Sequence, residues 1–213
     1  TRPETVTEEK KKKWQNVGLH RMVVGLEHGN EDFRKKILDR RWKNKDIVKA
    51  CSIPKKLGVP FSVNNITGFP KETRELAFDT IEINREIDAT NQNIYSFVPF
   101  HGTPLRKLTE SLGLIDHKTI TKCLTDKPQV VLPDYPPEVI EGIKRTFVLY
   151  VKFPKNRWND IKRAEKFTDE GNKIYLELKQ EFLEKYMPKA DVDPTSDVSM
   201  SNNDKRGYSD EMV

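Results

Sequence analysis

Residues 21–30 read RMVVGLEHGN, and this stretch decides how the rest of the chain is expected to fold. The first six residues, Arg21 to Leu26, form a short apolar run typical of a buried strand. A polar turn with a glycine follows, and Asn30 can cap a helix predicted from Glu31 to Leu38. A buried strand that passes through such a turn into a helix is the repeating unit of a parallel α/β sheet.

The same unit occurs twice more along the chain. Phe61 to Ile66 predicts a second strand and Asn93 to Val98 a third, each followed by a helical pattern. This alternation argues for a parallel sheet with crossover helices, because hairpins would need turns of only a few residues. The other expected helices are one capped by Thr7 that stops at Gly18, one capped by Asn44 that Pro54 should kink or end before Gly58, one over about 72–87, and one from Pro104 to Leu112.

The character of the chain changes after Gly113. A proline-rich loop leads into a helix predicted from about Glu138 to Lys152, and further helical stretches reach Tyr186. The aromatic side chains there are interpreted as core or interface residues rather than as a cofactor site. From 188 to 213 the chain is polar with no periodic apolar set, which predicts a disordered tail. We therefore expect three regions: residues 1–113, an α-helical region over 114–187, and the tail over 188–213.

Composition excludes several classes of protein. The 213 residues carry 38 Lys and Arg against 33 Asp and Glu, and no apolar run approaches the ~20 residues that a membrane helix needs. The first residue is Thr and no apolar leader follows, so we expect no signal peptide, no membrane partner, and a chain that begins partway through a longer one. Two cysteines, Cys51 and Cys123, exclude a disulfide scaffold and any site that needs three thiolates, and they favour the cytoplasm.

The charge pattern says little about partners. The dense run Lys10 to Lys13 adjoins two glutamates in a helical stretch. A solvated helix face is therefore favoured over a nucleic-acid patch. The histidines and cysteines show no metal-type spacing, and no phosphate-binding glycine loop or Ser/His/Asp arrangement is present.

Polar, glycine-bearing turns follow all three predicted strands, at Gly25 to Asn30, Asn64 to Pro70 and Pro99 to Pro104. Ligands of parallel α/β folds collect at these carboxyl ends of the strands, so the three turns predict one shared ligand site. Each turn also has a plainer interpretation. Glu27 could cap the following helix, the adjacent Asn64 and Asn65 could close a turn, and His101 could be a solvated loop residue.

Three of these segments resemble motifs of the radical S-adenosylmethionine (SAM) superfamily. The run GLEHGNE at 25–31, with Arg40 downstream, resembles the Gly-x-Glu-Ser-Gly-Asn-Glu…Asn-Arg segment of these enzymes. The run VNNITGFPKET at 63–73 is similar to their Asn-x-Ile-Gly-x-Pro-Gly-Glu-Thr segment, and FVPFHGTPL at 97–105 to their Tyr-Pro-x-Pro-Gly-Thr-x-Leu strand exit. Residues 1–7 resemble the link after the third barrel strand. The branch with cobalamin-binding members is the most similar.

The resemblance implies a partial (β/α) barrel of which this chain holds the C-terminal half. We interpret the helices after Gly113 as an α-helical appendage that packs across the barrel mouth or binds the substrate. It also implies an enzyme that reductively cleaves SAM to a 5′-deoxyadenosyl radical, as a cobalamin-dependent methyltransferase or a cyclase-like member. The Cys-x-x-x-Cys-x-x-Cys loop that holds the 4Fe-4S cluster is absent, so the cluster and a cobalamin domain would lie outside this chain. The implied partners are the N-terminal half of the same protein and a reductant such as flavodoxin or ferredoxin.

By the same resemblance, Glu27, Arg40 and Asn64 would contact SAM, with Arg2 a further candidate for its carboxylate. The ammonium, carboxylate and ribose hydroxyls of SAM suit a carboxylate, a guanidinium and an amide. Gly68 and Gly102 would let the backbone approach the adenine and ribose. His28, Asn65 and His101 depart from the family's pattern.

Two other functions remain open at this point. One is a non-catalytic α/β binding module that contacts RNA through the basic helix. The other, a methyltransferase that uses SAM without radicals, is disfavoured because no glycine-rich loop follows the first strand.

Overall fold

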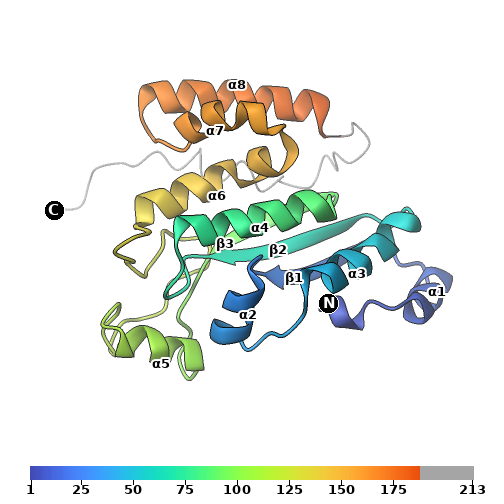
Figure 1. The fold of residues 1–213 in the computed structure, drawn as a ribbon, viewed down its shortest axis with the longest axis horizontal. Coiled ribbons are helices and arrows are strands. Elements are labelled where there is room, and N and C mark those ends of the chain that lie inside the picture. Colours follow the sequence, from blue (N-terminus) through green and yellow to red (C-terminus); the bar gives the residue numbers. More distant parts are fainter. Residues whose placement is uncertain (188–213) are drawn as a thin grey trace.

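A computed structural model describes residues 1–187, and the predicted tail over 188–213 lies outside the described residues. Three parallel strands form one sheet in the order β1-β2-β3, and helices connect them (Figure 1). The predicted fold class is therefore confirmed. The strands are β1 (Met22–Glu27), β2 (Phe61–Thr67) and β3 (Asn91–Ser96). The helices are η1 (Pro3–Thr5), α1 (Glu8–Asn16), α2 (Glu31–Ile37), α3 (Asn44–Lys56), α4 (Arg74–Ile87), α5 (Pro104–Ser111), α6 (Pro137–Lys152), η2 (Lys155–Arg157), α7 (Trp158–Ala164) and α8 (Asp169–Lys185).

The two faces of the sheet differ in polarity. On the face packed by helices, Val24 and Val63 are fully buried, as the alternation of a half-buried strand requires. On the other face, Gly25, Asn64 and Asn93 stand opposite one another across the three strands and are half-buried. We call this second surface the open face.

Several element boundaries differ from the sequence predictions. The third strand begins at Asn91 and ends at Ser96, not over 93–98, because Asn91 and Gln92 pair with β2 although both are polar. The helix expected to be capped by Asn44 is preceded instead by Lys43, which makes no side-chain cap. The Asn30 cap is confirmed, since its side chain accepts a hydrogen bond from the Phe33 N–H at 2.8 Å.

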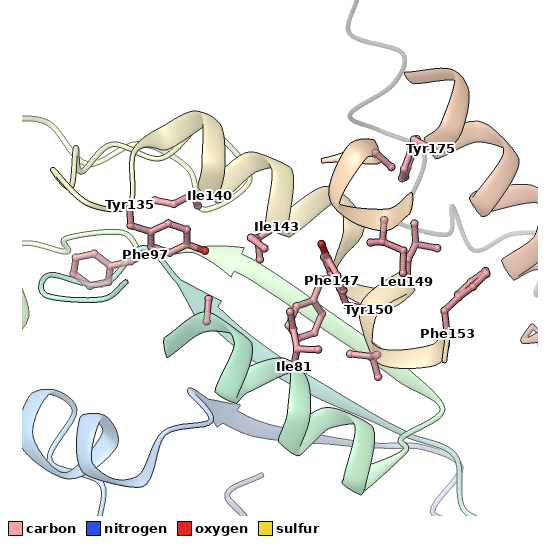
Figure 2. Close-up of a cluster of buried hydrophobic side chains, with 14 of the residues drawn as sticks. Ile81, Phe97, Tyr135, Ile140, Ile143, Phe147, Leu149, Tyr150, Phe153 and Tyr175 are labelled. Carbon is pink, nitrogen blue, oxygen red and sulfur yellow. The ribbon is translucent and has the colours of Figure 1, made fainter. Parts of the chain in front are cut away.

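The segment after Gly113 reaches the carboxyl end of β2 through Tyr135 and Ile140, and its helices then pack along the side of the sheet. Helix α6 packs along α4 and β3, and α7 and α8 stack beyond α6 (Figure 1). Its buried side chains, among them Ile143 and Phe147, join those of α4 in one core (Figure 2). Arg85 of α4 fixes the far end of α6 by donating to the carbonyl oxygens of Tyr150, Val151 and Phe153. The boundary proposed at residue 113 stays a prediction.

None of the helices within residues 1–187 combines the length and apolar character needed to cross a membrane.

Candidate functional site at the carboxyl ends of the strands

Glu27 ends β1 in an unusual backbone conformation. Its φ is +70°, and the pairing register with β2 shifts between Gly25 and Glu27. The carboxylate folds back over the open face, so that a Cβ on Gly25 would lie only 2.8 Å from Glu27 Oε1. Burial raises the pKa of the Glu27 carboxyl, and the positive charges of Arg40 and Arg2 oppose this. Glu27 does not cap α2, because Asn30 does.

Arg40 and Arg2 lie near Glu27 and line one hollow of about 410 Å³. Its other lining residues are Glu4, Leu38, Asp39, Arg41 and Trp42. Arg40 is half-buried with its guanidinium carbon 5.3 Å from the centre of the Trp42 ring, whereas Arg2 is exposed. Two guanidinium groups beside one partly buried carboxylate give this end of β1 the means to bind a group that carries both charges.

Asn64 lies inside β2 rather than in a turn, on the open face opposite Gly25. Its Oδ1 accepts a hydrogen bond from Asn93 Nδ2 of β3 at 2.9 Å. The neighbouring Asn65 points to the helix-covered face instead, where it exchanges amide hydrogen bonds with Asn84 of α4. Of the two adjacent asparagines, only Asn64 is therefore presented on the same face as Glu27.

The glycines at the strand exits have different surroundings. Gly68 has φ +85° and is buried, with its Cβ position 3.1 Å from the Ile140 side chain of α6. Gly102 has φ +79° and is exposed, as is His101. Gly29 packs against α4 so closely that a Cβ would lie 2.2 Å from the Asp79 carbonyl oxygen. The lack of a side chain at Gly29 thus serves packing against α4, not approach to a ligand.

A buried polar network below the strand exits was missed by the sequence analysis. Glu72 Oε2 accepts hydrogen bonds from the N–H groups of Gly68 and Phe69 at 2.6 and 2.9 Å, and Oε1 accepts one from Thr67 at 3.1 Å. His28 Nε2 lies 3.3 Å from Glu72 Oε1. Tyr135 completes the network through its hydroxyl, 2.9 Å from that of Thr67, and burial followed by the charge of Glu72 raises its pKa.

The position of Glu72, directly before the Thr73 that caps α4, is the only sequence signal that pointed to it. A glutamate there faces back toward the preceding turn, where unpaired N–H groups need an acceptor. The buried carboxylate of Glu72 fixes the turn after β2 by holding its backbone N–H groups.

The two cysteines do not fit an iron–sulfur cluster. Cys51 is buried in α3, where burial raises its thiol pKa to about 12, and Cys123 is exposed in the loop before α6. Within residues 1–187 no group of three or more His, Cys, Asp or Glu side chains is arranged to hold a metal ion. A larger cleft of about 890 Å³ between α2, α3 and α4 has carboxylates as half of its lining residues, and neither Glu27 nor Asn64 is among them.

Comparison with known proteins gives a match to one family model. The model of the Radical SAM superfamily matches residues 1–82. A curated relative, tRNA-2-methylthio-N(6)-dimethylallyladenosine synthase of Halalkalibacterium halodurans, is 29% identical over 91 residues, which are 42% of this chain and 17% of that protein. The chain thus spans less than a fifth of the length of this relative.

Two solved structures match part of the chain. The radical SAM methyltransferase TsrM of Kitasatospora setae, solved with cobalamin and a [4Fe-4S] cluster, matches with a TM-score of 0.50 and 13% identity over 84% of this chain and 44% of its own. The coproporphyrinogen III oxidase HemN of Escherichia coli, described as a radical SAM enzyme, matches with a TM-score of 0.44 and 14% identity over 53% of this chain and 31% of its own.

Proposed function

We propose that this chain supplies part of the SAM pocket of a radical SAM enzyme, because residues 1–82 match the model of the Radical SAM superfamily. In this proposal Glu27 accepts hydrogen bonds from the ammonium of SAM, Arg40 and Arg2 bind its carboxylate, and Asn64 contacts the ribose hydroxyls. One observation carries the proposal. The partly buried Glu27 carboxylate lies over the open face that also carries the Asn64 amide, and the guanidinium groups of Arg40 and Arg2 lie near that carboxylate.

The chemistry of these groups fits the amino-acid end of SAM. The partial burial of Glu27 strengthens its attraction for a cation, and the arginines offset the cost of keeping it ionised. Arg40 is the better placed of the two arginines, because the Trp42 ring limits the freedom of its side chain. Gly68 and Gly102 stay predicted backbone contacts, Gly102 being the exposed one.

SAM would supply a 5′-deoxyadenosyl radical once reduced at a [4Fe-4S] cluster. The residues of this chain do not fit that cluster, so its ligands and any cobalamin site are proposed to lie elsewhere in a longer protein. The methyltransferase or cyclase-like subtype, the reductant and the cytoplasmic location also remain predictions. What this chain contributes is the binding and orientation of the cosubstrate.

The test compares SAM binding by variants of the full-length protein, using equilibrium dialysis. Glu27→Gln and Asn64→Ala should each weaken binding about tenfold, equivalent to ~1.4 kcal/mol. Glu86→Gln and Asn156→Ala, two exposed positions, serve as matched controls and should leave binding unchanged. Equal affinities across all variants, or no SAM binding by the wild type, would refute the proposed pocket.

A second measurement addresses the reaction itself. The full-length protein, reconstituted with iron and sulfide and then reduced, should form 5′-deoxyadenosine from SAM. A reconstituted and reduced protein that binds SAM but forms no 5′-deoxyadenosine would contradict radical chemistry, while leaving the binding site in place.

A further inference from the structure

Arg34 is a fully buried cation on α2 that no step of the proposed function uses. Within residues 1–187, all four hydrogen bonds of its guanidinium go to carbonyl or amide oxygens, and none goes to a carboxylate. Burial lowers its pKa, and the charge of Glu31 on the same helix opposes this. A buried charge whose hydrogen bonds all go to neutral groups is costly for a fold, and an apolar side chain at this position would cost less. The residue therefore needs an explanation beyond stability.

The hydrogen bonds of Arg34 join two separate segments. Nη1 donates to the carbonyl oxygens of His28 and Gly29, the two residues that directly follow Glu27, at 2.6 and 3.0 Å. Nη2 donates to the carbonyl oxygen of Trp42 at 2.9 Å and to Asn44 Oδ1 at 2.6 Å. Asn44 closes the arrangement by donating from Nδ2 to the Gly29 carbonyl oxygen at 3.0 Å.

The second segment is the one that carries Arg40. It leaves α2 through Asp39, whose φ is +47°, and the Arg40 N–H donates to the Arg34 carbonyl oxygen at 2.9 Å. The backbone of Arg34 thus holds the Arg40 N–H, and the side chain of Arg34 holds the carbonyl oxygen of Trp42, two residues further along. Arg34 therefore fixes the chain directly after Glu27, at Arg40 and just beyond Arg40.

From this geometry we propose that Arg34 is a positioning residue that sets the placement of Glu27 relative to Arg40, and with it the binding of the amino-acid end of SAM. The inference rests on the proposed function of Glu27 and Arg40. A planar guanidinium is needed because four acceptors lie around it in a fixed arrangement, which a single ammonium cannot satisfy together.

The test is a ligand comparison in the full-length protein. Arg34→Lys keeps the charge but loses the fork, so it should weaken SAM binding about tenfold. It should leave the affinity for 5′-methylthioadenosine unchanged, because that molecule lacks the ammonium and carboxylate. Asn44→Ala, a milder change at a half-buried position, should weaken SAM binding by about threefold with the same selectivity. If Arg34→Lys fails to fold, Asn44→Ala carries the test.

Arg85→Lys is the matched control. Arg85 also donates to three carbonyl oxygens, but at the C-terminal end of α6, so this variant should lose stability while binding both ligands as the wild type does. Equal weakening of SAM and 5′-methylthioadenosine by Arg34→Lys would mean a general structural role and would overturn the inference. Unchanged SAM binding would overturn it as well.

Hydrogen exchange separates this inference from the proposed function. Arg34→Lys should speed amide exchange in residues 27–30 and 38–43 together, while residues 61–67 of β2 keep their protection. If the wild-type protein binds neither ligand, the proposed function fails and this exchange result alone decides the role of Arg34. Exchange that rises in only one of the two segments would overturn it.

Discussion

Replacing Glu72 by glutamine should destabilise the chain far more than its position in a turn suggests. The carboxylate accepts three hydrogen bonds, two of them from backbone N–H groups, and lies 3.3 Å from His28 Nε2. His28 Nδ1 accepts a hydrogen bond from the Asn30 N–H, which places the proton of a neutral ring on Nε2, the nitrogen nearer to Glu72. A glutamine amide would place an NH₂ group against at least one of these donors.

The magnitude follows from those contacts. Converting two charge-assisted hydrogen bonds into neutral ones costs about 1–2 kcal/mol together, and setting a buried donor against the His28 N–H costs about 1–3 kcal/mol more. We expect a loss near 3 kcal/mol in the free energy of unfolding. At a typical urea slope this lowers the midpoint by about 1–2 M.

The assay is urea unfolding of the 213-residue chain, followed by circular dichroism and tryptophan fluorescence. Glu86→Gln is the matched control, because Glu86 is exposed on α4, the helix that follows Glu72, and should change stability by less than about 0.5 kcal/mol. A Glu72→Gln chain as stable as the Glu86→Gln chain would refute the reasoning and show that the carboxylate is not the group that holds the turn after β2.

Three further outcomes are expected. Gly29→Ala should cost more than about 3 kcal/mol, because its Cβ would lie 2.2 Å from a backbone oxygen of α4 that cannot move independently; thermal unfolding measures this, and a near-normal melting temperature would contradict the packing. Burial would raise the pKa of Asp88, but hydrogen bonds from two lysine side chains outweigh it and lower that pKa; Asp88→Asn should therefore cost about 0.5–1 kcal/mol near pH 7, and the difference should vanish as the pH falls through the lowered pKa, as denaturation at several pH values would show. A thiol reagent should modify exposed Cys123 in the folded chain and buried Cys51 only after denaturation, and rapid native modification of both thiols would contradict the placement of α3.

The strand exits were predictable from sequence because each follows an apolar run and contains residues with narrow backbone or capping preferences. The side to which a strand residue points was harder to predict, since the register shift at Glu27 moves its carboxylate onto the open face. The roles of Asn64 and Asn65 separated only once the strand alternation was known. Side chains alternate between the two faces of a strand, so a predicted register that is wrong by one residue assigns every side chain to the opposite face.

The buried charges were not predictable by the same means. Arg34 follows Phe33 and precedes Ile37 on a short helix, where an arginine is ordinarily interpreted as solvent-exposed. Three of its four partners are backbone carbonyl oxygens, which every residue has, so these contacts cannot be recognised in the sequence. The place of α6 beside α4 and β3 likewise depends on a long loop whose path no local pattern encodes.

The amides of Asn64 and Asn93 give the open face a further consequence. An apolar surface packed against these amides would leave their remaining donors and acceptors without partners, at a cost of about 1–3 kcal/mol for each unpaired group. Only a molecule that supplies its own hydrogen-bonding groups, or that leaves ordered water between itself and the amides, can cover the open face without this cost. The open face therefore disfavours non-specific apolar association and remains able to bind a polar ligand.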